Sequence, residues 1–350
     1  MALIFVDAFV RYTTKTEMAK RGWTIGSGSS FSPTGSRFGG GALAVGSGTE
    51  TSLSFQTAGR LIFQMAFVPQ SFGGSDYWLI YNNSGADLCL QIEVSPAGAL
   101  VVKDAATAVI YTGPGGQLSP ATFHTIAVEA DIGSDGVGPG TGIVKIWLDQ
   151  PSSGATPIVN LANVDLRVGS ATTADKINFG TGAHTLSDFI LYDSSGATQN
   201  VYLGDKRLYA VNTVAETADQ AWTPQTGADN AVMVGTAVKP LTAAASSATY
   251  NSAAAVPRLD LYTYDDIPLT ATGIVAVVVE LEASKTDAGA PPGAFKARID
   301  DGLGTGLDGP VHTLLWPTYR IFQSFFLDVP GDVGWTATQV NNAVAGPKVV

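Results

Sequence analysis

The chain has 350 residues, a formal net charge of −11, only 14% charged residues, and 40 glycines with 18 prolines. That length suits two domains, and a globule of this mass buries roughly 70–75% of its extended surface without needing disulfides or metals. A strongly acidic chain gains nothing from releasing phosphate counterions, so we expect no nucleic-acid partner. We expect no membrane partner either, because anionic lipids repel the chain and no apolar run reaches about 18 residues.

Short apolar runs bounded by Gly, Pro, Asn or Asp recur along the first part of the chain and predict strands. In chain order these runs are 1–12, 42–45, 51–55, 60–69, 76–83, 88–94, 99–104, 123–132, 142–150, 175–180 and 186–193. The Ser-Pro-Ala-Gly turn at 95–98 predicts a hairpin between 88–94 and 99–104. The glycine-rich stretch before 142 predicts another hairpin, between 123–132 and 142–150.

Helix signals are scarce. Thr14 is a candidate N-cap with Glu17 three residues later and Gly22 as a stop, and Thr336 or Thr338 caps a second short helix near the end. Many strands with few short helices predict an all-β protein built from sandwiches or jelly rolls.

The stretch at 194–203 is rich in turn-forming residues and poor in core residues, which predicts a domain boundary. We therefore expect one domain at 1–197 and a second β domain at 198–350. After an Ala-, Ser- and Thr-rich stretch, strands return at 258–266, 273–283, 294–300 and 319–329.

Two sets of segments carry a resemblance. "FHTIAVEADI", "GIVKIWLDQ" and "VNLANVDLR" resemble the late strands of a laminin-G or concanavalin-like jelly roll. Six further segments, in the same order along nearly the whole chain, resemble tailed-bacteriophage virion proteins. They are "FVDAFVRYTT", "GSRFGGGALAV", "VDLRVGSATTADKINFG", "DFILYDSSGATQNVYLGDKRLYAV", "WTPQTGADN" and "WTATQVNNAVAGPKVV", of which "LGDKR" and "WTPQTG" are the most specific.

The resemblance implies a concanavalin/laminin-G-like jelly-roll sandwich followed by a second β-sandwich-like domain. It also implies a non-enzymatic structural protein located in the virion, with other virion proteins as partners. The resemblance leaves open whether the protein lies on the tail, as part of a fibre or tip, or decorates the capsid surface. One departure is "AVMVGTAVKPLTAAASSATY" after "WTPQTGADN", where such proteins tend to continue with an acidic stretch.

Two alternatives involve carbohydrate. Tyr77, Trp78 and Tyr81 lie on one predicted strand, so some of these rings would face solvent and stack on a host-surface glycan. Glu280 and Glu282 lie two residues apart on another strand and share a face, as the paired carboxylates of a glycanase do. Ala283 and Ser284 break the longer acidic pattern of such enzymes, so a solvated strand face is the preferred interpretation of that pair and the glycanase ranks below the glycan-binding module.

The sequence predicts no bound cofactor and no catalytic residue set. Asp300, Asp301 and Asp308 lie in a Gly-rich loop, where two interpretations stay open, a plain turn and a calcium site. The three histidines, His124, His184 and His312, lack metal-ligand spacing. The lone cysteine, Cys89, is expected to be a small, semi-buried side chain.

Two features predict self-association or contacts with neighbours. The strand 142–150 has apolar residues on both faces, so we expect Trp147 to touch the neighbouring domain or another chain. The stretch 236–257 carries one charge and few large side chains, which favours packing along a partner. These features favour a homo-oligomer, and a flexible surface loop is the alternative for 236–257.

Overall fold

A computed structural model describes the chain in two compact units, Met1–Leu208 and Tyr209–Val350. It describes every residue except 1–2, 11, 13, 33, 39, 47–49, 73–74, 83–85, 133–139, 168–171, 181, 194–200, 226–228, 232–250, 254–255, 286–292, 303–304, 315–319 and 331–333. Within the described residues, no helix has both the length and the apolar character needed to cross a membrane. The expected packing stretch at 236–257 lies largely outside the described residues.

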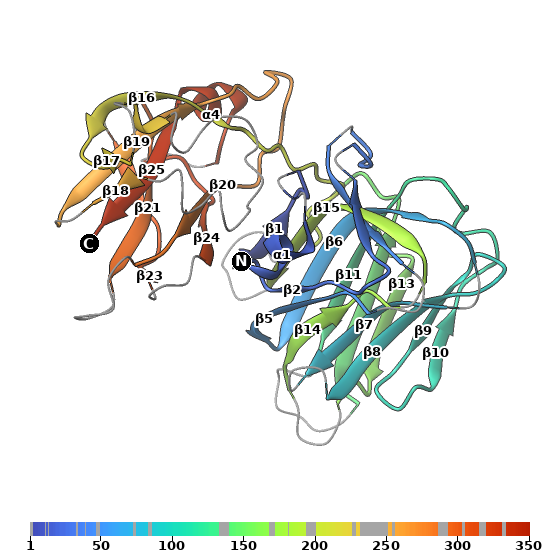
Figure 1. The fold of residues 1–350 in the computed structure, drawn as a ribbon. Helices are drawn as coiled ribbons and strands as arrows, with labels where there is room; N and C mark the ends of the chain where they lie inside the picture. Colours follow the sequence, from blue (N-terminus) through green and yellow to red (C-terminus); the bar gives the residue numbers. More distant parts are fainter. Residues whose placement is uncertain are drawn as a thin grey trace. The chain divides into compact units, whose positions relative to one another are not determined.

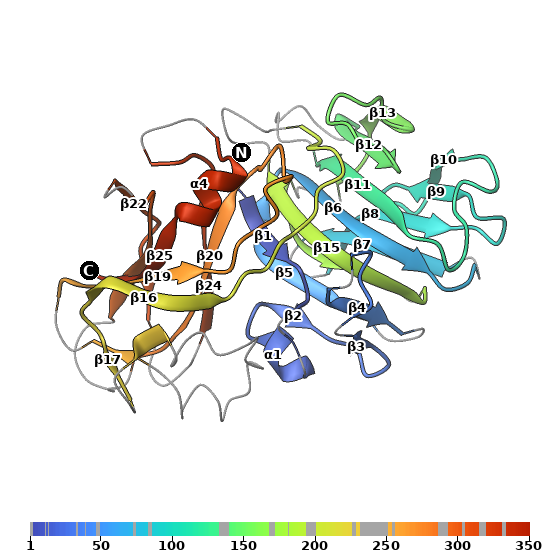
Figure 2. The ribbon, with the colours of Figure 1, turned by 90° about the horizontal axis from the view of Figure 1, so that it is seen from above.

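Two antiparallel sheets build the first unit, and neighbouring strands of each lie side by side in Figures 1 and 2. The first sheet, here sheet A, runs β13 (Val159–Val164), β12 (Gly142–Leu148), β11 (His124–Asp131), β6 (Arg60–Pro69), β15 (His184–Asp193), β4 (Ala42–Val45) and β3 (Ser30–Ser32), with β1 (Leu3–Asp7) paired to β15. The second sheet, sheet B, runs β10 (Val109–Thr112), β9 (Leu100–Lys103), β8 (Asp87–Val94), β7 (Ser75–Asn82), β14 (Ala174–Asn178), β5 (Ser52–Ala58) and β2 (Trp23–Thr24).

The two sheets face each other across an aromatic core. The ring of Phe67 on β6 meets the ring of Trp78 on β7 edge to face, with their centroids 5.0 Å apart. Trp23 on β2 packs in the same way against Phe189 on β15, at 5.8 Å. Side chains alternate along a strand, so one face of each sheet supplies this core. The predicted all-β sandwich is confirmed.

A buried polar cluster ties the first strand to the short helix α1 (Lys15–Ala19) and to β2. The Asp7 carboxylate, 1% exposed, accepts hydrogen bonds from Tyr12 Oη at 2.5 Å and Trp23 Nε1 at 3.0 Å. It also pairs with the guanidinium of Arg21, 3.0 Å away and 7% exposed. Burial and the charge of Asp7 raise the pKa of Tyr12, so its hydroxyl stays a donor.

The second unit has one larger sheet with smaller strand pairs. The larger sheet, sheet C, runs β16 (Thr213–Gln220), β19 (Arg258–Tyr264), β25 (Val344–Val349), β21 (Ala294–Asp300) and β22 (Gly306–Asp308), with β23 (His312–Thr313) paired to β21. The pairs are β20 (Val277–Ala283) with β24 (Arg320–Phe326) and β17 (Thr223–Pro224) with β18 (Asn251–Ser252). Helix α4 (Ala337–Asn342) begins after Thr336, whose Oγ1 accepts from Gln339 N at 3.2 Å, so Thr336 and not Thr338 is the cap.

The β20–β24 pair packs on sheet C as a small sandwich. Val279 and Phe326 from the pair share a core with Ala297, Ile299 and Trp335. Trp335 Nε1 donates to Phe326 O at 3.0 Å, so the largest ring of this core is also hydrogen-bonded. The expected β-sandwich-like character of the second domain follows from this packing.

One buried carboxylate organises the start of the second unit. Asp260 is 1% exposed, and its Oδ1 accepts from Ala221 N at 2.6 Å and Trp222 N at 2.8 Å. Its Oδ2 accepts from Asn230 Nδ2 at 2.7 Å and Tyr262 Oη at 2.9 Å. Four neutral donors thus hold one carboxylate and connect β16, β17 and β19.

Candidate functional site

A segment of eight residues, Val201 to Leu208, crosses the face of sheet A that points away from the aromatic core; we call it the strap. Gln64, Ala127 and Trp147 are register partners on β6, β11 and β12, so they share that outer face. The ring of Tyr202 stacks on Trp147 with centroids 4.9 Å apart and an interplanar angle of 21°. The three residues Ala127, Trp147 and Tyr202 form a buried apolar cluster.

Polar contacts fasten the ends of this stack. Trp147 Nε1 donates to Ala155 O at 2.8 Å, and Tyr202 Oη donates to Gln150 O. The cover of Trp147 is Tyr202, which the predicted boundary at 197 had placed in the neighbouring domain and which the structure places in the same unit. A contact of Trp147 with another chain stays a prediction. The same observation moves the domain boundary from 197 to Leu208, because the strap packs on the first unit.

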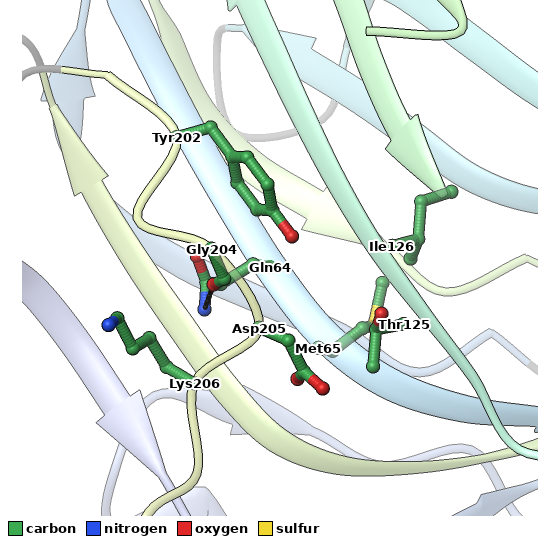
Figure 3. Close-up of a pocket in the computed structure, with 8 residues that line it drawn as sticks. All are labelled: Gln64, Met65, Thr125, Ile126, Tyr202, Gly204, Asp205 and Lys206. Carbon is green, nitrogen blue, oxygen red and sulfur yellow. Dashed lines mark hydrogen bonds between the residues drawn. The ribbon is translucent and has the colours of Figure 1, made fainter. Parts of the chain in front are cut away.

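A small hollow lies between the strap and the sheet. Gln64 points at the strap and donates from Nε2 to Gly204 O at 3.3 Å (Figure 3). The hollow is lined by Gln64, Met65, Thr125, Ile126, Tyr202, Gly204, Asp205 and Lys206. Its volume is about 10 Å³, which is room for about one water molecule. At this point the strap leaves no space for a sugar ring.

Ionic contacts hold the rest of the strap to the loop before β4. Arg37 and Asp205 form a bidentate ion pair, in which Arg37 Nη1 donates to Asp205 Oδ2 at 2.6 Å and Arg37 Nη2 donates to Asp205 Oδ1 at 2.7 Å. The guanidinium groups of Arg37 and Arg207 each lie 4.3 Å from the ring centre of Phe38. This geometry is the strong, bidentate form of the arginine–carboxylate pair.

The strap ends on a bulge of β15. Asp188 sits in the left-handed region, with φ of 52°, where the register with β6 shifts. Its Oδ1 accepts from Leu208 N at 3.0 Å. Burial raises the pKa of Asp188, although the Leu208 N–H and the charge of Arg37 oppose that rise. The bulge therefore turns a polar side chain toward the strap.

Replacing Gly204 by alanine should loosen the strap. A Cβ there would lie 2.8 Å from Pro151 O and 2.9 Å from Ser153 N, and the φ of +79° adds about 1–2 kcal/mol of strain. We expect the amide hydrogen of Leu208 to exchange at least about tenfold faster, since each 1.4 kcal/mol of lost stability is tenfold in an equilibrium.

Gly116 provides the matched control for this substitution. It has a similar φ of +77° but nothing within 4 Å of its Cβ position, so Gly116→Ala carries the strain without the clash. Equal exchange rates for Leu208 in both variants would show that Gly204 is not a close-packing position.

The expected sugar-stacking residues do not form an exposed platform. Tyr77 and Trp78 are each 0% exposed, because His184 stacks on Tyr77 at 5.0 Å while Phe67 covers Trp78. Tyr81 is half-buried, with the Lys176 ammonium 6.0 Å from its ring centre. A buried ring cannot stack on a glycan, so this prediction is corrected for Tyr77 and Trp78.

The three loop aspartates contact protein groups. Asp300 and Asp301 accept backbone N–H bonds from Gly302 and Thr305, both at 3.1 Å, which is turn geometry. Asp308 lies beside the side chains of Lys296, Arg298 and Lys348, whose positive charges would repel a calcium ion. Across the part of the chain that the structure describes, no group of three or more His, Cys, Asp or Glu side chains gathers as metal ligands.

The remaining candidates also make structural contacts. Glu280 on β20 accepts from Gln323 Nε2 on β24 at 3.2 Å. His124 Nδ1 lies 2.7 Å from Asp149 Oδ2, and His312 Nε2 lies 3.0 Å from Ser324 Oγ. Cys89 is fully buried, and burial raises the pKa of its thiol to about 12, so the thiol stays protonated and inert.

His184 should make the first unit sensitive to acid. Its side chain is fully buried, and burial lowers its pKa to about 4, although a hydrogen bond to Gly182 O opposes this. The unfolded chain takes up the proton near pH 6.5, so the contribution is complete above that pH and is lost as the pH falls to about 4. We expect about 3 kcal/mol less unfolding free energy at pH 4 than at pH 7 from this residue.

Urea unfolding of the wild type and of His184→Gln at both pH values measures this loss. The variant should be less stable at pH 7 but should lose about 3 kcal/mol less on acidification. Equal losses in both proteins would assign the acid sensitivity to other groups.

No family model and no curated protein matches the chain. Among solved structures, a sialidase matches over 55% of this chain and 19% of its own, with 10% identity and a TM-score of 0.39. An alginate lyase from Aplysia kurodai matches over 55% of this chain and 99% of its own, with 11% identity and a TM-score of 0.41. A carbohydrate-binding module from Bacillus subtilis matches over 49% of this chain and 96% of its own, with 9% identity and a TM-score of 0.33.

The similar solved structures thus include carbohydrate-binding modules, glycoside hydrolases and lyases. With identities this low and TM-scores below 0.5, these likenesses say nothing of the activity or ligand of this chain. The sandwich assignment rests on the strand pairing itself.

Proposed function

We propose that the chain is a non-enzymatic structural protein of a tailed-phage virion that also presents a carbohydrate-binding surface for attachment to the host. The observation that carries the structural part is the strap. The segment "LGDKR" is one of the two most specific parts of the virion-protein resemblance. Its Asp205 pairs with Arg37 of the loop before β4, and its Gly204 O accepts from Gln64 of sheet A. The next residue, Leu208, donates its N–H to Asp188 of β15. Such a segment maintains a rigid building block.

Particle labelling tests the structural part. An antibody raised against the purified chain should bind tailed particles released by the cells that make it, at the tail or on the capsid surface. Gold labels in micrographs locate the antibody, and stripping the particles of their tails separates the two locations. Label found only on free protein, with clean particles beside it, would overturn the virion assignment.

Two exposed rings favour the carbohydrate-binding part. Phe123 is 36% exposed on the first unit, and Phe38 is 44% exposed although the guanidinium groups of Arg37 and Arg207 lie 4.3 Å from its ring centre. Exposed aromatic faces and edges give sugar rings an apolar surface to contact. A glycan array probed with the wild type should show binding that Phe38→Ala or Phe123→Ala weakens, and Val109→Ala, exposed by 57%, is the control. Equal signals from all four proteins would remove these rings from the proposal.

A further inference from the structure

Basic side chains gather on the face of sheet C that points away from its core. Phe295, Ala297 and Ile299 of β21 are each 1% exposed and face the core. The residues between them, Lys296 and Arg298, therefore lie on the opposite face, with side chains 28% and 22% exposed.

These two residues share one carboxylate with Lys348 of β25. Asp308 on β22 accepts two hydrogen bonds. Lys348 Nζ donates to its Oδ2 at 2.7 Å, and Arg298 Nη1 donates to its Oδ1 at 3.1 Å. Lys296 Nζ lies 3.8 Å from Oδ2, which is an ion pair without a hydrogen bond. Burial raises the pKa of Asp308, but the hydrogen bonds from Lys348 and Arg298 outweigh burial and lower the pKa below its ordinary value. Asp300, 3.9 Å from Arg298, is the second carboxylate nearby.

The three basic side chains outnumber the two carboxylates near them, Asp308 and Asp300. Lys296 and Lys348 are direct cross-strand partners in the β21–β25 pairing. Like charges placed directly opposite each other destabilise an antiparallel pair. The chain has only 19 Lys and Arg against 30 Asp and Glu, so placing three cations around Asp308 concentrates a scarce charge.

The backbone also makes room for the guanidinium. A Cβ at Gly306 would lie 2.3 Å from Arg298 Nη2, so the guanidinium rests against bare glycine. Lys296 Nζ has no hydrogen-bond acceptor within the described residues, and Lys348 Nζ donates there only to Asp308. Both ammonium groups therefore keep donors for a further acceptor.

We infer that Lys296, Arg298 and Lys348 form a binding site for an anionic group, a phosphate or a carboxylate, carried by a cell-surface polysaccharide. The polysaccharide part of this inference rests on the proposed function. Lysine and arginine bind such oxygens through charge-assisted hydrogen bonds, and the arginine fork matches their geometry. Asp308 occupies the site in the absence of ligand and competes with the incoming anion.

Titration of the full chain with inorganic phosphate, a polyuronate oligosaccharide and a neutral dextran tests the site. Calorimetry should show the two anions binding and the dextran failing to bind at this site. Lys348→Gln should weaken anion binding about tenfold, the value of one charge-assisted hydrogen bond. Lys103→Gln is the matched control, because Lys103 pairs with the single carboxylate of Glu93 and lies in the first unit.

Asp308→Asn separates a binding site from a purely structural ion-pair cluster. Removing the competing carboxylate should strengthen anion binding about tenfold. A structural cluster would instead lose stability without gaining affinity. Should Asp308→Asn fail to fold, Lys296→Gln replaces it, with weaker binding expected. Wild-type affinity in Lys348→Gln, or no anion binding by the wild type, would overturn the inference.

Anion titration combined with particle labelling separates this inference from the proposed function. If Lys348→Gln weakens anion binding but the particles carry no label, the anion site is supported and the virion role is wrong. If the particles are labelled but the purified protein binds neither anion, the virion role is supported and the anion site is wrong.

Discussion

Asp7→Ala should lower the free energy of unfolding of the first unit by about 3–5 kcal/mol. The substitution leaves the Arg21 guanidinium, 7% exposed, without the carboxylate 3.0 Å away. It also leaves Tyr12 Oη and Trp23 Nε1 without their acceptor in the core. A buried charge that has lost its partner costs far more than the pair itself contributes.

Denaturant unfolding followed by hydrogen exchange measures this effect and locates it. Asp165→Ala is the control, because Asp165 is exposed and its carboxylate accepts, among the described residues, only a local bond from Arg167 N. Protection should fall in β1, α1 and β2 of the Asp7 variant. An effect below about 1 kcal/mol, the range of ordinary surface changes, would show that Arg21 finds water or another acceptor.

Asp260→Ala should have a comparable effect on the second unit, about 3 kcal/mol or more. Its carboxylate satisfies two backbone N–H groups, of Ala221 and Trp222, and two side-chain donors, of Asn230 and Tyr262. Ala221 N also donates to Leu259 O at 3.1 Å and Asn230 Nδ2 to Trp222 O at 3.0 Å, so Trp222 N and Tyr262 Oη are the donors left orphaned. Each orphaned buried donor costs about 1–3 kcal/mol.

Asp260→Asn is the informative companion variant. The amide keeps one acceptor oxygen and the shape of the side chain but places an NH₂ group against existing donors. We expect a loss between that of alanine and zero, with amide exchange accelerated in β16 and β19. Full stability in Asp260→Ala would mean that the four donors reach other acceptors.

The strands were predictable because their signals are local. The run 60–69 became β6 with the same bounds, and 123–132 became β11 at His124–Asp131. Thr14 and Glu17 also formed the predicted cap, with Thr14 N donating to Glu17 Oε2 at 3.1 Å. Alternation and capping depend on neighbours within a few residues, which a sequence shows directly.

The candidate site was not predictable in the same way, because long-range packing decides it. Arg37 and Asp205 lie 168 residues apart, and nothing near either residue names its partner. Trp147, on a strand apolar on both faces, did signal a missing cover, but the cover came from a segment assigned to the next domain. Alternation required one of Tyr77 and Trp78 to face outward, yet rings from other strands cover both.

The strap also determines how the first unit bears tension. A pull on the chain beyond Leu208 reaches the strap before it reaches β15, which precedes the strap in sequence. The Leu208–Asp188 hydrogen bond, the Arg37–Asp205 ion pair and the Tyr202–Trp147 stack must break before the load passes along the chain to that strand. Since β15 is hydrogen-bonded to strands on both sides, its extraction would open the sheet. For a pull from the C-terminal side, we therefore expect the strap contacts to break before the strand pairing of the sandwich.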